Sequence, residues 1–406
     1  MLISSALVLL MTPGLAFFYG GLVKRKNVIN TIMSSIFVMG LASVMWMLVG
    51  FTLSFSGDIG GVIGNFKWFA LNQVDALPGP YAATIPNLCF AIYQMMFAII
   101  TPALITGSIV ERMKFSSLFV FVAVWSLCVY YPLAHMVWGG GILQQLGLVD
   151  FAGGFVVHIS SGVSALILAL ILGKRTNIEK ASYHPHNVPF VLLGAALLWF
   201  GWFGFNAGSA GAANEIAVRA FMNTNMSAAS ALLSWMFVET VKNGKPTLVG
   251  TSTGFVVGLA AVTPAAGFVP VWASVLIGLV ASPLCFYFIT HVKPKFGYDD
   301  ALDTFGCHCI GSTWGVLATG LFAKMSLNGA LQWNGLLLGG GMQLMIRQIL
   351  GVGVTVVLSV AGTLFALWIA KLATKKIRVS VREESMGLDI SEHGESAYPA
   401  YNGMDN

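Results

Sequence analysis

Two histidines, His158 and His308, lie inside long apolar stretches of the chain. Each stretch is long enough to cross a bilayer and holds almost no other ionisable group. Ionisable side chains at that depth are costly, and they mark substrate or ion pathways. A neutral imidazole donates a hydrogen bond from one ring nitrogen and accepts one at the other. A pair of imidazoles therefore suits a small hydrogen-bonding solute that must shed its water.

The composition indicates a polytopic membrane protein. Only 9% of the residues are charged and 57% are hydrophobic, whereas an ordinary soluble domain has about 25% charged residues. Apolar runs near the span of about 20 residues that a bilayer requires predict an all-α fold of eleven transmembrane helices. Their expected starts are Leu2, Val28, Thr84, Ser117, Phe151, Val188, Asn214, Leu248, Val269, Thr304 and Gly341. We expect a membrane domain over residues 1–371 and a cytoplasmic tail over residues 372–406.

The distribution of positive charge predicts the orientation of the chain in the membrane. Of the 21 lysines and arginines, 17 fall in the tail or in loops that follow odd-numbered spans. Short cytoplasmic loops retain positive charge, so we expect the amino terminus outside and the carboxyl-terminal tail inside. The net charge of +5 is then mainly an orientation signal, and we expect no nucleic-acid partner.

The five cysteines are odd in number and lie within or beside apolar spans, so we expect no disulfides. Cys307, His308 and Cys309 resemble a metal-binding cluster. Successive residues of a helix point about 100° apart, however, and three of them cannot converge on one tetrahedral ion. Small residues that pack a helix interface explain the cysteines better. We therefore expect neither a metal nor another cofactor.

The spans divide into two sets of five, followed by a long peripheral eleventh helix. An odd number of helices in each unit forces the second copy to be inverted in the membrane. His158 lies on span five and His308 on span ten, which are equivalent helices. A lone histidine in a helix is often a satisfied core residue, but two on equivalent helices favour a shared pathway.

Aromatic residues and glycine concentrate in three further segments, AIYQMMFAIIT, HMVWGGG and GWFGFNAGSAG. The faces of aromatic rings hold a cation with about 0.5 to 2 kcal/mol, depending on desolvation. Ser209, one turn beyond Phe205, is placed to accept a hydrogen bond from such a cation. The alternative is that these rings only anchor and pack helices.

Together the motifs resemble those of the Amt/Mep/Rh ammonium transporters, and the bacterial or archaeal Amt branch fits best. The resemblance covers essentially the whole chain. It rests on HMVWGGG, DFAGGFVVHI from Asp150, GWFGFNAGSAG, ANEIA, VTPAAG and DTFGCHCIG. It implies a transporter of ammonium or ammonia in the cytoplasmic membrane and not an enzyme. It also implies a homotrimer with one pore in each subunit.

The resemblance further implies a role for each matching residue. Trp138, Phe97 and Ser209 would form an outer ammonium recruitment site, Phe97 and Phe205 a gate below it, and His158 and His308 a hydrogen-bonded pair lining the pore, with Trp202 and Thr263 supporting the pathway. Asp150 matches an aspartate near the recruitment site, and it also opens span five as a good helix N-cap. Structural and electrostatic roles for Asp150 both stay open.

A physical argument connects these residues to a mechanism. Moving a bare monovalent ion into a medium of low dielectric costs on the order of 20 kcal/mol before relaxation reduces it. The chain past the gate supplies no evident carboxylate to offset that cost. Ammonium, unlike potassium or sodium, escapes the cost by giving up its proton and continuing as ammonia. The sequence leaves open whether the proton returns, follows by a separate route or crosses with the nitrogen.

Two other classes of protein compete with this interpretation. A haem-carrying redox protein uses paired intramembrane histidines, but only one pair is present here. An ammonium sensor would need a partner, because the chain after the last span is too short for an independent domain. That charged tail is either a disordered end or, as the resemblance implies, part of a docking surface for a PII-type signal protein.

Overall fold

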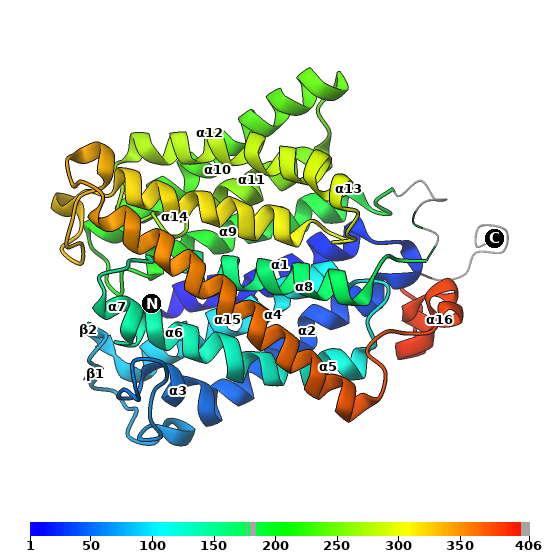
Figure 1. Cartoon of the computed structure of the whole chain (residues 1–406), viewed down its shortest axis with the longest axis horizontal. Helices are drawn as coiled ribbons and strands as arrows, with labels where there is room; N and C mark the ends of the chain where they lie inside the picture. The colour runs from blue at the N-terminus through cyan, green and yellow to red at the C-terminus, as the bar shows by residue number, and fades with distance from the viewer. Residues whose placement is uncertain (177, 179–183, 399–406) are drawn as a thin grey trace.

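The computed structural model describes residues 1–176, 178 and 184–398, which form a bundle of long helices lying side by side (Figure 1). The helices of the first half are α1 (Leu2–Leu22), α2 (Val28–Met45), η2 (Trp46–Gly50), α3 (Phe51–Phe55), α4 (Asn87–Ile109), α5 (Phe115–Trp125), η4 (Ser126–Tyr130), α6 (Tyr131–Trp138), α7 (Ile142–Gln145), η5 (Gly154–Ile159) and α8 (Ser160–Leu172). Those of the second half are α9 (Val188–Gly208), α10 (Glu215–Asn243), α11 (Leu248–Val262), α12 (Val271–Tyr287), η6 (Phe288–Val292), α13 (Lys293–Phe296), η7 (Phe305–Ile310), α14 (Gly311–Phe322), α15 (Gln343–Thr374), α16 (Val381–Met386) and η10 (Asp389–His393). Short elements in the loops are η1 (Arg25–Asn27), η3 (Phe69–Leu71), η8 (Met325–Leu327), η9 (Leu336–Leu338) and the antiparallel pair β1 (Pro78–Gly79) and β2 (Ala82–Pro86).

Eight of the described helical segments are long and apolar enough to cross a membrane. Three more lie where the sequence predicts spans seven, eight and ten, and they are Glu215–Asn243, Leu248–Val262 and Phe305–Phe322. For each of the eleven predicted spans, the observed helix begins within three residues of the predicted start. The chain is therefore an all-helical, multi-pass membrane protein, while eleven crossings and the inverted repeat stay predictions.

Glycines allow α1 and α9, the first helices of the two predicted repeats, to approach closely. A Cβ atom added at Gly194 would lie 2.2 Å from the backbone nitrogen of Phe18, and one at Gly14 would lie 2.9 Å from Cβ of Leu197. Small residues let helix backbones meet where lipid supplies no hydrophobic drive for association. This crossing joins the two halves of the bundle.

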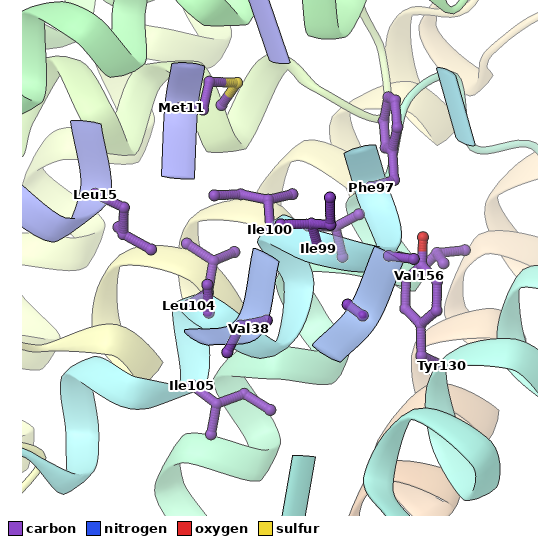
Figure 2. Close-up of a cluster of buried hydrophobic side chains, with 14 of the residues drawn as sticks. Met11, Leu15, Val38, Phe97, Ile99, Ile100, Leu104, Ile105, Tyr130 and Val156 are labelled. Carbon is purple, nitrogen blue, oxygen red and sulfur yellow. The ribbon is translucent and has the colours of Figure 1, made fainter. Parts of the chain in front are cut away.

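The hydrophobic core surrounds α4, which contributes aliphatic residues along its length (Figure 2). These side chains pack with residues of α1 and α2, and the group includes Met11, Leu15, Val38, Ile99, Ile100, Leu104 and Ile105. Phe97 lies at one end of the group. The helix that carries the predicted gate is thus fixed by packing on its neighbours. The 32-residue α15 crosses the front of the bundle obliquely and packs on α5, α8 and α14 (Figure 1).

Both predicted pore histidines lie in π-helical turns at the start of their helices. His158 belongs to η5, which continues into α8, and His308 belongs to η7, which continues into α14. π-helical turns are rare and are frequent at functional sites. Turns of the same kind also occur at η2, η4, η6 and η10.

The tail folds back onto one end of the bundle, which we call the tail face (Figure 1). Lys114 N donates to Ile377 O at 3.0 Å, and Asn30 N donates to Asp389 Oδ1 at 2.9 Å. Leu388 N donates to the side chain of Asn27 at 2.8 Å. Over its described residues the tail is therefore ordered, and the alternative of a disordered end is wrong there. The opposite end of the bundle, with β1, β2 and α7, is called the far face below.

Candidate functional site

The three predicted recruitment residues line one cavity of about 490 Å³ at the far face. Phe97 comes from α4, Trp138 from the end of α6, and Ser209 from the end of α9. The Phe97 and Trp138 rings meet edge to face, with centroids 6.0 Å apart and planes at 85°. Three elements far apart in the sequence thus converge on a pocket walled by aromatic rings.

Phe97 and Phe205 meet at the base of this cavity, as the resemblance predicts for the gate. Their ring centroids lie 4.3 Å apart with planes at 35°, and both side chains are buried. Phe97 lines the cavity, whereas Phe205 does not. Phe205 therefore lies behind Phe97 as seen from the cavity, in contact with it.

Hydrogen bonds orient Ser209 towards an accepting role. Its Oγ donates to the carbonyl of Phe205 at 2.9 Å, and Tyr93 OH donates to the same carbonyl at 2.6 Å. With its proton committed to that carbonyl, the hydroxyl of Ser209 offers lone pairs to a donor in the cavity. Sequence reasoning missed Tyr93 and Gln94, which also line the cavity. The sequence feature that could have identified them as cavity residues is their position within one turn before Phe97.

Asp150 binds the first amides of the helix that carries His158, although the N-cap position itself is occupied by Gly153 and not, as the sequence predicts, by Asp150. Its Oδ1 accepts from the amides of Gly153 and Gly154 at 2.9 and 2.7 Å, and its Oδ2 accepts from that of Phe155 at 2.8 Å. The carboxylate satisfies amides that would otherwise be orphaned at a helix start. Its own backbone carbonyl accepts from Trp138 Nε1 at 2.9 Å. The residue thus connects the start of η5 to the recruitment cavity.

The two predicted pore histidines lie next to each other below the gate. Their ring centroids are 5.3 Å apart with planes at 14°, and the residues are only 1% and 4% exposed. The His158 ring also lies 6.1 Å from Phe205 and 5.4 Å from Trp202, nearly parallel to both. The structure thus brings Phe205, His158 and His308 together in one row.

The expected hydrogen bond between the two imidazoles is absent, which corrects the sequence-based prediction. Both ring nitrogens of His158 and Nδ1 of His308 have no hydrogen-bond partner among the described residues. The physical reason is packing. The His158 ring is held beside Trp202 and Phe205, and in that position its nitrogens meet no acceptor or donor of His308. Buried polar atoms without partners are rare and call for an explanation.

Trp202 and Thr263 support the row of rings from one side. Trp202 Nε1 donates to Thr263 Oγ1 at 2.8 Å, and Thr263 Oγ1 donates to Leu259 O at 2.8 Å. Both residues are fully or almost fully buried. The indole is therefore locked beside His158, which is consistent with the predicted supporting position.

A second cavity, of about 170 Å³, lies on the tail-face side of the pair. His308 and Cys307 line it together with Tyr19 and Asp303. The imidazoles therefore stand between a large cavity at the far face and a smaller one nearer the tail.

Asp300 is a further candidate site residue, equivalent in position to Asp150, that sequence reasoning missed. It stands eight residues before His308, just as Asp150 stands eight residues before His158. Its Oδ2 accepts from the amide of Phe305 at 2.7 Å, at the start of η7. Burial raises the pKa of Asp300 to about 6. The repeated spacing of aspartate and histidine was the available signal.

Comparison with known proteins gives a consistent family. The sequence model described as Ammonium Transporter Family matches residues 1–398. The ammonium transporter of Bacillus subtilis is 48% identical over 398 residues, which cover 98% of this chain and 97% of the relative. The putative ammonium transporter of Methanothermobacter thermautotrophicus is 49% identical over 401 residues, which cover 98% and 97%.

Solved structures agree with the sequence relatives. Saccharomyces cerevisiae Mep2 superposes with a TM-score of 0.89 at 34% identity, over 99% of this chain and 91% of Mep2. A protein described as Sensor Amt Protein superposes with a TM-score of 0.87 at 30% identity, over 96% of each chain. The resemblance seen in the motifs is thereby confirmed. The chain belongs to the ammonium transporter family, whose named members are transporters and not enzymes.

Proposed function

We propose that the protein recruits ammonium at the far-face cavity, removes its proton at the phenylalanine gate and passes ammonia along His158 and His308. The single observation that carries this proposal is the pair of buried imidazoles with unpartnered nitrogens, standing between two cavities. A solute with both N–H donors and a lone pair matches nitrogens that donate and accept.

Capture at the cavity combines two kinds of contact. The rings of Phe97 and Trp138 present aromatic surface to a cation, and Ser209 Oγ accepts one N–H. Ring contacts of this kind contribute about 0.5 to 2 kcal/mol, with the larger values in desolvated sites. Potassium has no N–H to direct at Ser209, so the hydrogen bond favours ammonium over an ion of similar charge.

The gate forces the change from ammonium to ammonia. Phe97 and Phe205 are fully buried and in contact, so a cation that passes between them loses its water. The idealised cost of burying such an ion is on the order of 20 kcal/mol. Among the described residues, no carboxylate lines the recruitment cavity, and Asp303 lines only the second cavity beside His308. A cation between the two phenylalanines therefore has no carboxylate to offset that cost. Loss of the proton removes the cost.

The imidazoles then act as independent partners for ammonia. Because no hydrogen bond joins the two rings, each neutral ring keeps one donor and one acceptor for the solute. Ammonia can give a hydrogen to one nitrogen while it accepts from the next. The path of the released proton is the part of the mechanism that requires measurement.

Transport in proteoliposomes tests the proposal. Ammonium-evoked current and ammonia-driven pH change are recorded in parallel for the wild type, His158→Ala and His308→Ala, with His291→Ala as a matched control. His291 lies outside the ring row, beside Thr290. The wild type should exclude potassium, and the two pore variants should lose that selectivity or lose transport. Unchanged selectivity in both pore variants would remove the imidazoles from the central role, and the ratio of charge to nitrogen identifies the net species.

We extend the proposal to the assembly and its setting. The family implies a homotrimer with one pore per subunit and eleven spans, placed in the cytoplasmic membrane for nitrogen uptake. The excess of lysine and arginine at the tail face supports an inside location for the tail. The far-face cavity then opens to the outside.

The ordered tail supports a docking surface for a PII-type signal protein. Its described residues lie against the loops of the tail face and form one surface with them. A pull-down with and without ATP or 2-oxoglutarate tests this partner. A sensor role is the second candidate, because the protein described as Sensor Amt Protein has the same fold over 96% of this chain.

A further inference from the structure

His135 is a fully buried histidine outside the ring row, one turn before Trp138 on α6. Its Nδ1 lies 3.0 Å from the backbone oxygen of Ser54, and its Nε2 lies 2.9 Å from Asp58 Oδ1. Ser54 belongs to α3, and Asp58 belongs to the loop that follows it. The imidazole therefore ties α6 to the first loop of the far face.

The partners of His135 are both hydrogen-bond acceptors. A backbone carbonyl can only accept, so Nδ1 carries a hydrogen. Asp58 Oδ1 also accepts from Gly61 N at 2.8 Å, and 43% of the Asp58 side chain is exposed. The hydrogen bond from His135 holds the pKa of Asp58 below its usual range, so the carboxylate is ionised at neutral pH. Both ring nitrogens of His135 thus face oxygen atoms, and Nε2 lies within ion-pair distance of the Asp58 carboxylate.

The backbone carbonyl of His135 fixes the glycine turn that follows Trp138, and the imidazole packs against that turn. Gly139 N and Gly141 N both donate to His135 O, at 2.9 and 3.0 Å. A Cβ atom at Gly139 would lie 2.0 Å from the oxygen of Ser54 and 2.8 Å from His135 Nδ1. Only glycine fits between the ring and this carbonyl, which accounts for part of the HMVWGGG motif.

The first far-face loop is joined to the turn at two further points. Gly61 O accepts from Ile142 N at 2.7 Å. Tyr81 OH donates to Gly139 O at 3.0 Å, and Tyr81 lines the recruitment cavity. The ion pair thus lies at the centre of a network whose other edge is the cavity wall.

We propose that the His135–Asp58 ion pair positions Trp138: it locks the first far-face loop onto the glycine turn and so holds the indole at its place beside Phe97. The inference rests on the proposed recruitment role of Trp138. His135 and Asp58 touch no solute themselves, and they act through the backbone on either side of the indole. Specificity of the cavity for ammonium then depends on a charge pair that lies outside the cavity.

The test compares ammonium uptake kinetics of full-length variants in proteoliposomes. Asp58→Ala removes the carboxylate and should raise the KM for ammonium about three- to tenfold, the range set by a weakened cation–ring contact. The maximal rate should stay within about twofold, because the gate and the imidazoles are untouched. Asp58→Glu keeps the charge and should restore most of the affinity. Asp75→Ala is the matched control, since the side chain of this exposed aspartate accepts from the amide of Leu77, within its own loop.

Two further variants separate the possible outcomes. Trp138→Ala should raise the KM; if it does not, the recruitment proposal itself fails. If Trp138→Ala raises the KM while Asp58→Ala does not, only the positioning role of the ion pair fails. His135→Gln combined with Asp58→Ala should be no worse than either single change, because paired residues are not additive. If His135→Gln does not fold, Asp58→Ala with its rescue by glutamate still decides the question.

Discussion

At the scale of single residues, the site depends on which polar atoms are satisfied and which are not. The carboxylate of Asp150 is fully used by backbone amides, and Tyr93 and Ser209 give their protons to backbone carbonyls. The nitrogens of His158 and Nδ1 of His308 are left without partners. Unpartnered buried groups persist where a ligand uses them. The row of rings thus offers unpartnered polar atoms to a solute, as does Gln94 Oε1 at the recruitment cavity.

The residue types of the site could be predicted, but the orientation of the rings could not. Spacing along a helix places His158 and His308 on equivalent helices and Ser209 one turn after Phe205. It does not fix side-chain torsions, which depend on packing against neighbours such as Trp202. For this reason the predicted hydrogen bond between the imidazoles was wrong although their proximity was right.

Asp150→Asn tests whether this aspartate acts mainly as a cap. The amide keeps the shape but loses one acceptor oxygen and the charge. Hydrogen bonds to charged groups contribute about 1.5 to 3 kcal/mol each, so we expect a loss of about 2 kcal/mol and a lower unfolding midpoint in detergent. The KM for ammonium should change less than twofold, because Trp138 is held by the backbone carbonyl of Asp150.

The control for that variant is Glu215→Gln, an exposed acidic residue in the first turn of α10. It should leave both the midpoint and the KM unchanged. A large rise in KM with an unchanged midpoint in Asp150→Asn would instead assign the aspartate an electrostatic role at the recruitment cavity.

At the scale of elements, periodicity and length predicted the helices well and their irregularities poorly. The helices at the eleven predicted spans begin within three residues of their expected starts, because apolar runs and turn residues fix these boundaries. The π-helical turns at η5 and η7 had no sequence signal, since they arise where tertiary packing inserts an extra residue into the helix. The contact between α1 and α9 was likewise not predictable from either helix alone.

Gly194→Ala tests that contact. The new Cβ atom would lie 2.2 Å from the backbone nitrogen of Phe18, so α1 and α9 must separate. Overpacking of this kind costs about 1 to 3 kcal/mol, and we expect a lower unfolding midpoint and less folded protein on size-exclusion chromatography.

Gly40→Ala on α2 is the matched control, because a Cβ atom there meets nothing within 4 Å. Alanine is favoured over glycine in a helix by about 1 kcal/mol, so this variant should have an unchanged or higher midpoint. Equal midpoints for the two variants would show that the crossing of α1 and α9 tolerates separation.

At the scale of the whole molecule, the ordered tail binds the loops of the first half and the segment that follows α8. Arg378 donates to Leu172 O at 2.6 Å and to Glu384 at 2.8 Å. The carboxylate of Glu384 also accepts from the amide of Thr176. Composition predicted a charged tail but not its order, because the contacts that hold it connect residues more than 200 positions apart. A change at the tail can therefore reach the loops next to the pore helices.

Glu384→Gln tests this connection and its dependence on pH. Burial by itself raises the pKa of Glu384, but the hydrogen bonds from Arg378 and Thr176 outweigh it and lower the pKa below its usual value. A carboxylate with a lowered pKa stabilises the fold above its ordinary range, and that stability is lost as the pH falls through the lowered value.

At pH 7 we expect roughly tenfold faster hydrogen exchange in Glu384→Gln at tail amides such as Val379 N, which donates to Arg112 O. Against wild type at the same pH, the difference should shrink as the pH falls below the ordinary range of glutamate, and it should disappear once Glu384 itself is protonated. Glu395→Gln, an exposed tail residue, should exchange like the wild type at both pH values, and equal exchange in Glu384→Gln at pH 7 would show that the tail is held without this ion pair.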